Sequence, residues 1–322
     1  MNRLARLARL ARAGAAALTA CLLLTAAAEP RPHATAAAPD IAVADVRAHL
    51  ADLAAVAEAN GGDRAHGQPG YAAAVDHLQA LLDEAGWTTV RQEFTHAGAT
   101  GYNLVAEWPH TATATATATA TDETLIAGAH LDTVRSVPGI NDNGSGSAVL
   151  LEVALAVAEA DLAPAKRLRF AWWGAEELGM VGSRHYLDTL PDADRAAVTG
   201  YLNSDMTGSA NPGYFVYDDD PALAGVLTDW FAARGVAVEP ADEMDGRSDH
   251  VPFLDAGIPV SGLFTGAGET MTEQQAALWD GTAGEPFDPC YHQACDDTAN
   301  VSETALDRTA DALAHAVWEL SA

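Results

Sequence analysis

Two adjacent carboxylates at the end of an apolar run are the residues of this sequence that most suggest chemistry. Glu176 and Glu177 follow the run Phe170–Trp173, which we predict to be a buried strand, and Gly179 comes soon after them. Neighbouring side chains on a strand point to opposite faces, but in a turn after the strand both can face one cleft. One carboxylate could then bind a cation while the other stays free as a general base. Because most glutamates face solvent, the pair alone decides nothing.

Other candidate ligands follow two more predicted strands. His130 comes directly after the apolar run Leu125–Ala129, and Asp205 ends a second predicted strand. In α/β sheets ligands collect at the carboxyl ends of the strands, so we expect His130, Glu177 and Asp205 to lie close together. Asp132, two residues after His130, is the kind of partner that holds a metal-binding imidazole in one tautomer.

These side chains and two others make up a set of metal-ligand types. The candidate ligands are His130, Asp142, Glu177, Asp205 and His292. Imidazole nitrogen and carboxylate oxygen are ligands of catalytic zinc, which keeps one position open for water. Five such groups exceed what one tetrahedral ion needs, whereas two zinc ions about 3.5–4 Å apart that share a carboxylate would use all of them. Asp142 precedes the glycine-rich start of a predicted helix, whose amide groups favour a buried anion, so we predict that Asp142 is the shared ligand.

Strands and helices are predicted to alternate along the chain. Apolar residues recur at helical spacing in 45–59, 71–85, 144–160, 220–234 and 302–320, and strand-like runs occupy 88–94, 103–108, 125–129, 168–173 and 201–205. This alternation favours an α/β fold, a three-layer α/β/α sandwich around a central mixed, largely parallel sheet. No linker or repeat divides the sequence of residues 38–322, which we predict to be a single catalytic domain. The Thr-Ala alternation at 111–121 has little to bury, and we predict an exposed hairpin loop there.

The N-terminus has the pattern of an export signal. Four arginines precede a short apolar stretch that ends with small residues suitable for cleavage. We therefore predict a signal peptide at 1–28, a pro-piece or disordered arm at 29–37, and a secreted, extracellular protein. The alternative is a lipoprotein anchored through Cys21. Three leucines directly after Cys21 disfavour it, because a polar tether is expected there.

Composition and charge narrow the class of protein. The chain has 322 residues, of which 49% are hydrophobic, so it can bury a sizeable core. Its formal net charge of −28 argues against nucleic acid or an anionic membrane as a partner. After removal of the predicted signal peptide, Cys290 and Cys295 are the remaining cysteines. An even pair in an exported chain favours a disulfide bond.

Six short motifs identify a family when they are taken together and in order. They are 129–132 (Ala-His-Leu-Asp), 139–146 (Gly-Ile-Asn-Asp-Asn-Gly-Ser-Gly), 173–179 (Trp-Gly-Ala-Glu-Glu-Leu-Gly), 203–206 (Asn-Ser-Asp-Met), 246–250 (Gly-Arg-Ser-Asp-His) and 290–292 (Cys-Tyr-His). The set resembles the secreted double-zinc aminopeptidases of streptomycetes, leucine-type members of the bacterial leucyl aminopeptidase family of zinc exopeptidases. The resemblance spans about residues 38–320.

The resemblance implies a role for each candidate ligand. One zinc ion would be bound by His130 and Asp205, the other by Glu177 and His292, and both by Asp142. Glu176 would be the general base, which takes a proton from the attacking water and passes it to the leaving amine. Tyr291 would stabilise the tetrahedral oxyanion through its hydroxyl group. A Cys290–Cys295 disulfide would pin the loop that carries Tyr291.

Two further features of the family carry over to this sequence. The resemblance implies a substrate pocket at Met206, Arg247 and Phe264, and one calcium ion bound by Asp40, the backbone oxygen of Ile41, Asp307 and Asp311. Asp307 and Asp311 stand four apart on a predicted helix, and hard carboxylate oxygens suit calcium. Each assignment has a simpler alternative. Met206 and Phe264 could be ordinary core residues, and Arg247 could form a salt bridge. The two aspartates could be solvated acids on the helix. Ser204 stands where these relatives carry an aromatic residue, which affects the packing of the pocket.

The expected reaction is removal of N-terminal residues, preferably large hydrophobic ones such as Leu, from peptides with a free N-terminus. We expect the enzyme to act as a monomer. The nearest alternative is a zinc carboxypeptidase or amidohydrolase of the same fold, which would recognise a carboxylate, normally with arginine. Arg247 is the one arginine that a motif brings near the site. A binding protein that has lost catalysis is disfavoured, because all five candidate ligands and Glu176 are present.

Overall fold

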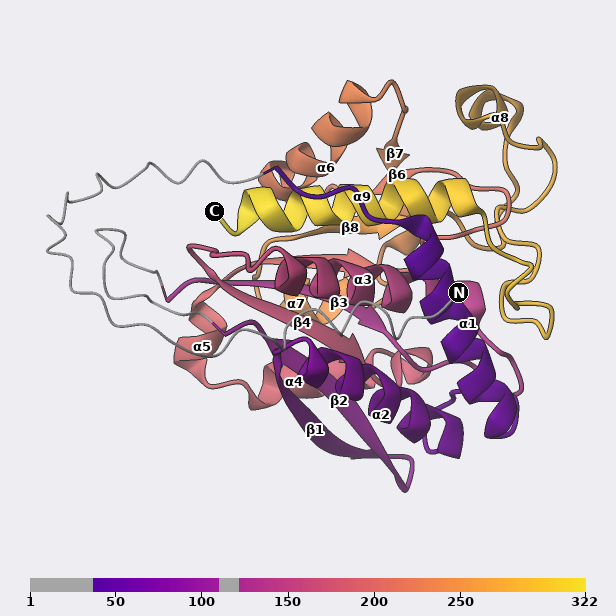
Figure 1. Ribbon diagram of the computed structural model, residues 1–322. Coiled ribbons are helices and arrows are strands. Elements are labelled where there is room, and N and C mark those ends of the chain that lie inside the picture. The colour runs from indigo at the N-terminus through magenta and orange to yellow at the C-terminus, as the bar shows by residue number, and fades with distance from the viewer. Residues whose placement is uncertain (1–36, 110–121) are drawn as a thin grey trace, which may run out of the picture. The chain divides into compact units, whose positions relative to one another are not determined.

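The computed structural model describes residues 37–109 and 122–322. The predicted signal peptide with Cys21, residues 29–36 of the predicted pro-piece and the Thr-Ala run at 111–121 lie outside the described residues. The described part contains an eight-stranded sheet with the strand order β1-β2-β4-β3-β5-β8-β6-β7 (Figure 1). Within these residues no helix has the length and apolar character needed to cross a membrane.

The sheet is mixed, with a parallel centre. Its strands are β1 Thr88–His96, β2 Ala99–Glu107, β3 Thr124–His130, β4 Arg167–Trp173, β5 Val198–Ser204, β6 Phe215–Val216, β7 Glu239–Pro240 and β8 Val260–Phe264. β4, β3, β5 and β8 are parallel neighbours, whereas β2 pairs antiparallel with β4 and β6 pairs antiparallel with β8. β1 and β2 form a hairpin at one end of the sheet, and β7 pairs with β6 at the other.

Helices cover both faces of this sheet. They are α1 Val43–Ala59, α2 Pro69–Glu84, α3 Gly146–Glu159, α4 Val181–Thr189, α5 Asp192–Ala196, α6 Pro221–Ala233, α7 His250–Asp255, α8 Glu273–Trp279 and α9 Glu303–Leu320. Alternate side chains of a strand enter opposite cores. In β4, Phe170 and Trp172 pack into a core with α1, α2, α3, α6 and α9, while Ala171 and Trp173 pack into another with α4 and α7. Figure 1 shows α3 and α9 lying across the sheet. The predicted three-layer α/β/α architecture is confirmed.

Several short elements were not predicted. Strands β6 and β7 have two residues each, and α4, α5, α7 and α8 have five to nine. Such elements span too few periods for their apolar spacing to be recognised. The start of the helix predicted at 144–160 also differs, because α3 is preceded by a kinked segment, Ile140–Ser145, in which Asp142 and Asn143 have non-helical backbone angles.

The parallel centre brings the candidate ligands to one edge of the sheet. His130 is the last residue of β3, and Asp205 directly follows β5. The short 3-10 helix Glu176–Leu178 follows β4. Because β3, β4 and β5 are parallel, their carboxyl ends lie at the same edge.

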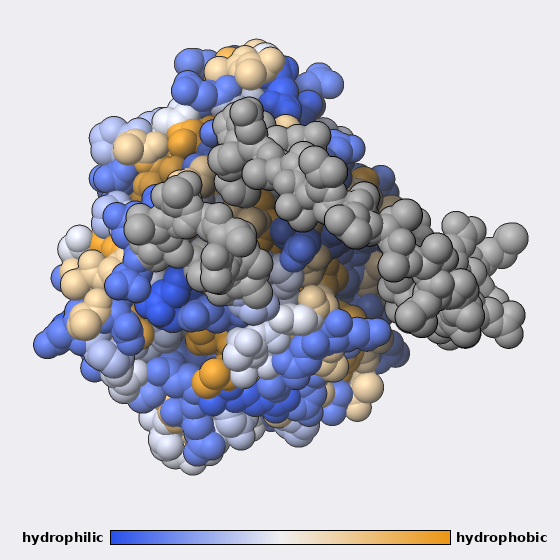
Figure 2. All heavy atoms as spheres, turned by 60° about the vertical axis from the view of Figure 1, so that its left-hand side comes forward, coloured by the Kyte–Doolittle hydropathy of each residue, from blue (hydrophilic) through white to orange (hydrophobic). Residues whose placement is uncertain are grey.

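The outer surface is mostly hydrophilic on the face that Figure 2 draws, and hydrophobic residues gather there in small groups. The large hydrophobic side chains that are exposed in the described part are Val90, Leu178, Leu254 and Leu278. These belong to four different elements, and exposed apolar side chains of this kind are common on protein surfaces.

Gly146 generates a stability prediction, because α3 begins there in contact with the end of β5. A methyl group added at Gly146 would lie 2.3 Å from the carbonyl oxygen of Ser204 and 2.5 Å from Oδ1 of Asn143. A backbone atom cannot easily move aside, so Gly146→Ala should lower the free energy of unfolding by about 1–3 kcal/mol. Urea denaturation with a chelator in every sample measures this change.

Gly225→Ala in α6 is the matched control. A methyl group added there meets no atom within 4 Å, and alanine is the better helix former by about 1 kcal/mol. We therefore expect this control to be neutral or slightly stabilising. Equal stability of the two variants would contradict the close approach of α3 to β5.

Candidate metal centre and active site

One small cleft gathers the predicted zinc ligands, the predicted catalytic residues and the predicted substrate residues. Its volume is about 60 Å³. The lining residues are His130, Asp142, Glu176, Glu177, Asp205, Met206, Met244, Arg247, Ser248, Phe264, Ala267, Tyr291 and His292. The fold therefore brings together side chains that are far apart in the sequence.

His130 is oriented by the residue two positions after it. Its Nδ1 lies 3.1 Å from the backbone carbonyl oxygen of Asp132, and the Asp132 carboxylate is 3.7 Å away. Because a carbonyl oxygen only accepts, this contact places the proton of a neutral imidazole on Nδ1 and leaves the Nε2 lone pair free. Nε2 faces Asp142 at 3.3 Å and Asp205 at 3.4 Å. The orienting group is thus mainly the carbonyl of Asp132, whereas the sequence suggested its carboxylate.

The carboxylate of Asp132 holds the turn that carries the two glutamates. Its oxygens accept the backbone N–H groups of Glu176 at 3.0 Å and Glu177 at 3.3 Å. Ala175 and Met180, on either side of this turn, have left-handed backbone conformations with φ of 57° and 58°. The chain therefore reverses within a few residues, and both glutamate side chains line the cleft.

Asp142 lies between two histidines. Its Oδ1 is 3.3 Å from Nε2 of His130, and its Oδ2 is 3.1 Å from Nε2 of His292. Nε2 of His292 is also 3.2 Å from Oε2 of Glu177. Burial alone would raise the pKa of Asp142, but with no metal ion bound, hydrogen bonds from the protonated imidazoles of His130 and His292 outweigh burial and hold that pKa well below its usual range. Asp142 is therefore an anion with one oxygen toward His130 and the other toward His292.

The other carboxylates of the cleft have unsatisfied oxygens. Oε1 of Glu177 and Oδ1 of Asp205 are buried and make no hydrogen bond to any described residue. Burial, and then the charge of Asp142, raises the pKa of Glu177 to about 7. A buried anion is costly unless a cation or a hydrogen bond compensates it. Ligand atoms of His130, Asp142 and Glu177 lie within 4.8 Å of one another. This donor set fits a metal ion such as zinc.

Tyr291 and Arg247 form a polar rim on the cleft. Nη2 of Arg247 donates a hydrogen bond to the Tyr291 hydroxyl at 3.2 Å, and the Tyr291 ring stacks on His292 with centroids 4.0 Å apart. Arg247 also lies 3.6 Å from Glu243 and 3.9 Å from Glu269. Burial, and then the hydrogen bond with Glu269, raises the pKa of Glu243 to about 8. One arginine is therefore shared by the rim hydroxyl and two carboxylates.

Met206 and Phe264 form the apolar part of the cleft. Their exposed fractions are 3% and 1%, and they line the cleft together with Met244 and Ala267. The sequence left open whether these two residues pack in the core or line the substrate pocket. In the structure both side chains are buried and both line the cleft.

The residues predicted to bind calcium lie together at a separate place. Oδ1 of Asp311 accepts the N–H of Ile41 at 2.7 Å. Burial raises the pKa of Asp311 to about 6, and the carboxylates of Asp40 and Asp307 add to this effect. Asp40 and Asp311 line a cavity of about 250 Å³. The contact of Ile41 with Asp311 uses its amide group, whereas the sequence prediction rests on its carbonyl oxygen.

The predicted disulfide between Cys290 and Cys295 is present. It closes the short loop that carries Tyr291 and His292. His292 has a left-handed backbone conformation with φ of 57°, so this loop is an irregular segment.

Two buried charged residues near the site were missed in the sequence. Arg64 is fully buried and donates to the carbonyl oxygens of Leu131, Pro138 and Gly139. Asp296 is also fully buried and accepts the backbone N–H groups of Asn141 and Asp142. Arg64 follows a glycine-rich turn that indicated only the end of a helix, and Asp296 is one of two consecutive aspartates. Local sequence gives no sign of partners so far away.

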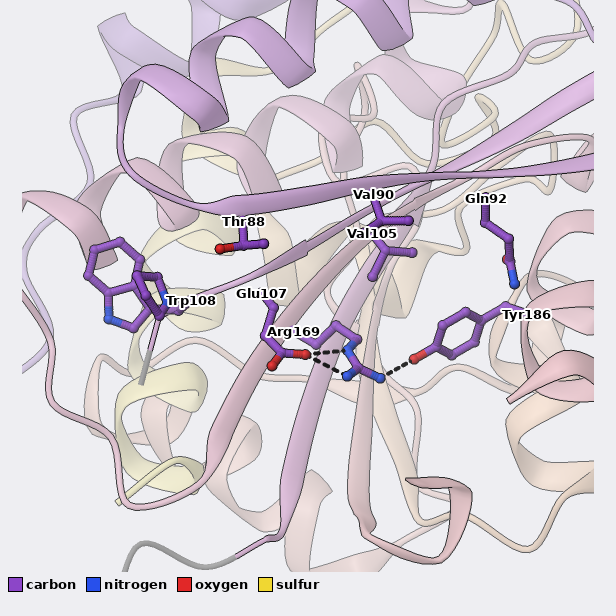
Figure 3. Close-up of a pocket in the computed structure, with 9 residues that line it drawn as sticks. Thr88, Val90, Gln92, Val105, Glu107, Trp108, Arg169 and Tyr186 are labelled. Carbon is purple, nitrogen blue, oxygen red and sulfur yellow. Dashed lines mark hydrogen bonds and ion pairs between the residues drawn. The ribbon is translucent and has the colours of Figure 1, made fainter. Parts of the chain in front are cut away.

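A larger cavity lies elsewhere, on the side of the β1–β2 hairpin (Figure 3). Its volume is about 460 Å³, and it is lined by Thr88, Val90, Gln92, Val105, Glu107, Trp108, Pro109, Arg169 and Tyr186. Arg169 donates to Glu107 and to the hydroxyl of Tyr186, both at 2.6 Å. The predicted site residues are not part of this lining, so size alone would point to the wrong cavity.

Comparisons with known proteins identify the family of this chain. The sequence pattern of peptidase family M28 matches residues 103–317. The Streptomyces exfoliatus protein named leupeptin-inactivating enzyme 1 is 54% identical over 299 residues, which are 92% of this chain and 66% of that protein. The chain spans 41–49% of other curated relatives, and so less than two thirds of each.

Solved structures show the same fold. An aminopeptidase from Aneurinibacillus sp. strain AM-1 superposes with a TM-score of 0.68 at 18% identity, covering 87% of this chain and 94% of that one. A zinc aminopeptidase from Bacillus subtilis superposes with a TM-score of 0.56 at 26% identity, covering 70% of this chain and 51% of that one. With the family pattern extending over the strands and loops that form the cleft, the chain belongs to peptidase family M28.

Proposed function

We propose that this protein is a secreted metallo-aminopeptidase that binds two zinc ions and removes large hydrophobic N-terminal residues from peptides. The observation that carries the proposal is the position of Asp142, whose two oxygens face His130 and His292 separately. A carboxylate between two sets of ligands suits a pair of ions better than a single ion.

The proposed ligand sets follow these contacts. His130 and Asp205 would hold one zinc ion, Glu177 and His292 the other, and Asp142 both. The distances between Nε2 of His130 and Asp205, and between Nε2 of His292 and Glu177, are 3.4 and 3.2 Å. When bound, the ions would supply Lewis-acid polarisation of the scissile carbonyl and a more acidic water. Oε1 of Glu177 makes no hydrogen bond, and Oδ1 of Asp205 has only the 3.4 Å contact with Nε2 of His130. These buried oxygens support the assignment, because each ion would neutralise one of them.

Glu176 is the proposed general base. It lines the cleft but belongs to neither ligand set. Burial raises the pKa of its carboxyl group, whereas the positive charge of the proposed ions would lower it and favour the carboxylate that a base requires. The backbone of Glu176 is fixed by the hydrogen bond to Asp132 at 3.0 Å. Glu176 would accept a proton from the attacking water and donate it to the nitrogen of the leaving amine.

Tyr291 is the proposed donor to the oxyanion. Arg247 donates to the Tyr291 oxygen, so the hydroxyl proton remains free to point at the developing negative charge. Donation by a cation also polarises the O–H bond and makes it a stronger donor. Glu243 and Glu269 hold the guanidinium in place at the rim.

The substrate's first residue would occupy the space between these groups. Its α-amine is a cation, and the carboxylates of Glu176 and Asp205 offer the complementary charge. Its side chain would pack against Met206 and Phe264, which favours large hydrophobic residues such as Leu. A carboxypeptidase or amidohydrolase would need a free cation for the substrate carboxylate. Arg247 is already engaged by Tyr291, Glu243 and Glu269.

The remaining expectations belong to the same proposal. A single catalytic domain at 38–322 would act as a monomer on peptides with a free N-terminus, after export and removal of the segments before it. One calcium ion would bind at Asp40, Ile41, Asp307 and Asp311, where three carboxylates and the start of the domain converge. Hard oxygen donors of this kind favour calcium over zinc.

The free α-amine provides the most direct test of the substrate class. We predict that the protein hydrolyses the p-nitroanilide of leucine, and that acetylation of its amine removes turnover, because the amine then loses its charge. Release of nitroaniline from both substrates, with and without a chelator, measures this. Efficient hydrolysis of the acetylated substrate would instead support the amidohydrolase alternative.

The two adjacent glutamates should be separable by mutation. We predict that Glu176→Gln keeps the wild-type zinc content but lowers kcat by about 10²–10⁴-fold, the usual contribution of a general base. Glu177→Gln should lower the zinc content itself. Elemental analysis and steady-state kinetics of both variants distinguish the two roles. Near-normal kcat of Glu176→Gln would show that another group is the base.

A further inference from the structure

Asp296 connects two segments of the cleft that come from distant parts of the chain. Its Oδ1 accepts the backbone N–H of Asn141 at 2.7 Å, and its Oδ2 accepts that of Asp142 at 3.0 Å. The backbone carbonyl of Asp296 also accepts the N–H of Ile140 at 3.2 Å. Three consecutive amide groups of the segment that carries Asp142 therefore bind one residue.

Asp296 directly follows the disulfide loop. Cys295 ends that loop, which carries Tyr291 and His292. On the other side of the loop, Asp288 accepts the N–H of Cys290 at 2.8 Å and the side-chain amide of Asn141 at 2.7 Å. The disulfide loop is thus fastened at both ends to the segment 140–142.

The two proposed ligand sets, His130 with Asp205 and Glu177 with His292, are held in position by different kinds of structure. His130 lies at the end of β3 and is positioned by the ladder hydrogen bonds of the sheet. His292 and Asp142 lie in irregular segments, and Nε2 of His292 is 3.1 Å from Oδ2 of Asp142. Besides this contact of His292 with Asp142, the hydrogen bonds that join the two segments in the described part of the chain are those of Asp296 and Asp288.

We infer that Asp296 is a positioning residue that sets the distance between Asp142 and His292 and thereby the affinity of the Glu177–His292 half for zinc. The inference rests on the proposed two-zinc function. Asp296 touches neither the ions nor the substrate, and it acts through the backbone of Asp142. Partners of metal ligands typically contribute 10–100-fold to metal affinity.

Asp296→Asn is the test variant. The asparagine has nearly the same shape, but its amide can accept only one of the two N–H groups and directs its own N–H toward the other. We predict that one of the two zinc ions binds about 10–100-fold more weakly, while the other changes little. Stepwise competition with a chelator of known zinc affinity measures both constants without reference to activity.

Asp63→Asn is the matched control, because Asp63 is also a buried aspartate whose two oxygens accept backbone N–H groups. Its partners are Ala65 at 3.1 Å and Ser136 at 2.8 Å, and neither is a proposed ligand. Unfolding of the zinc-free proteins should show comparable losses of stability for the two variants. Only Asp296→Asn should lower the affinity of a single zinc ion.

If Asp296→Asn does not fold, Asp296→Glu replaces it. Glutamate keeps both acceptor oxygens but displaces them by one methylene group, so the same single-site weakening is expected. Unchanged affinities in a folded variant at Asp296, or an equal loss in Asp63→Asn, would overturn the inference. A wild-type protein that binds no zinc would instead refute the proposed function, so the two failures are distinguishable.

Discussion

The rest of the site depends on the concentration of buried negative charge around Asp142. Asp142, Glu177 and Asp205 face one small cleft, and the oxygens of the last two include atoms with no hydrogen-bond partner among the described residues. In a low-dielectric setting such a group of anions is unfavourable by itself. His130 and His292 offset part of this cost by contacts to Asp142. Divalent cations would offset the rest, which links the stability of the cleft to the chemistry proposed for it.

The fold supplies these groups by two different means. Parallel strands β3, β4 and β5 end at one edge of the sheet, so His130, Glu177 and Asp205 are positioned by regular structure. Asp142 and His292 come from irregular segments, where buried polar groups replace the sheet. Asp132 connects the end of β3 to the turn after β4, because its carbonyl faces His130 and its carboxylate accepts the backbone N–H groups of Glu176 and Glu177.

Much of the fold and the composition of the cleft could be predicted from sequence, for identifiable reasons. The strands that end at His130 and Trp173 are apolar runs bounded by polar residues, and this pattern is local. The candidate ligands lie in motifs whose order is itself informative. By contrast, the buried positions of Arg64 and Asp296 depend on partners more than 65 and 150 residues away. Short elements such as β6 and β7 are formed by pairing with β8 and with each other rather than by their own sequence.

The zinc content of the purified wild-type protein tests the central claim most directly. The claim is that five side chains around a shared Asp142 hold two ions. The protein is dialysed first against buffer that contains a zinc salt and then against metal-free buffer. Elemental analysis should then give about two zinc ions per chain. A content of one ion or none would contradict the account, because Asp142 would then not be a ligand shared by two zinc ions.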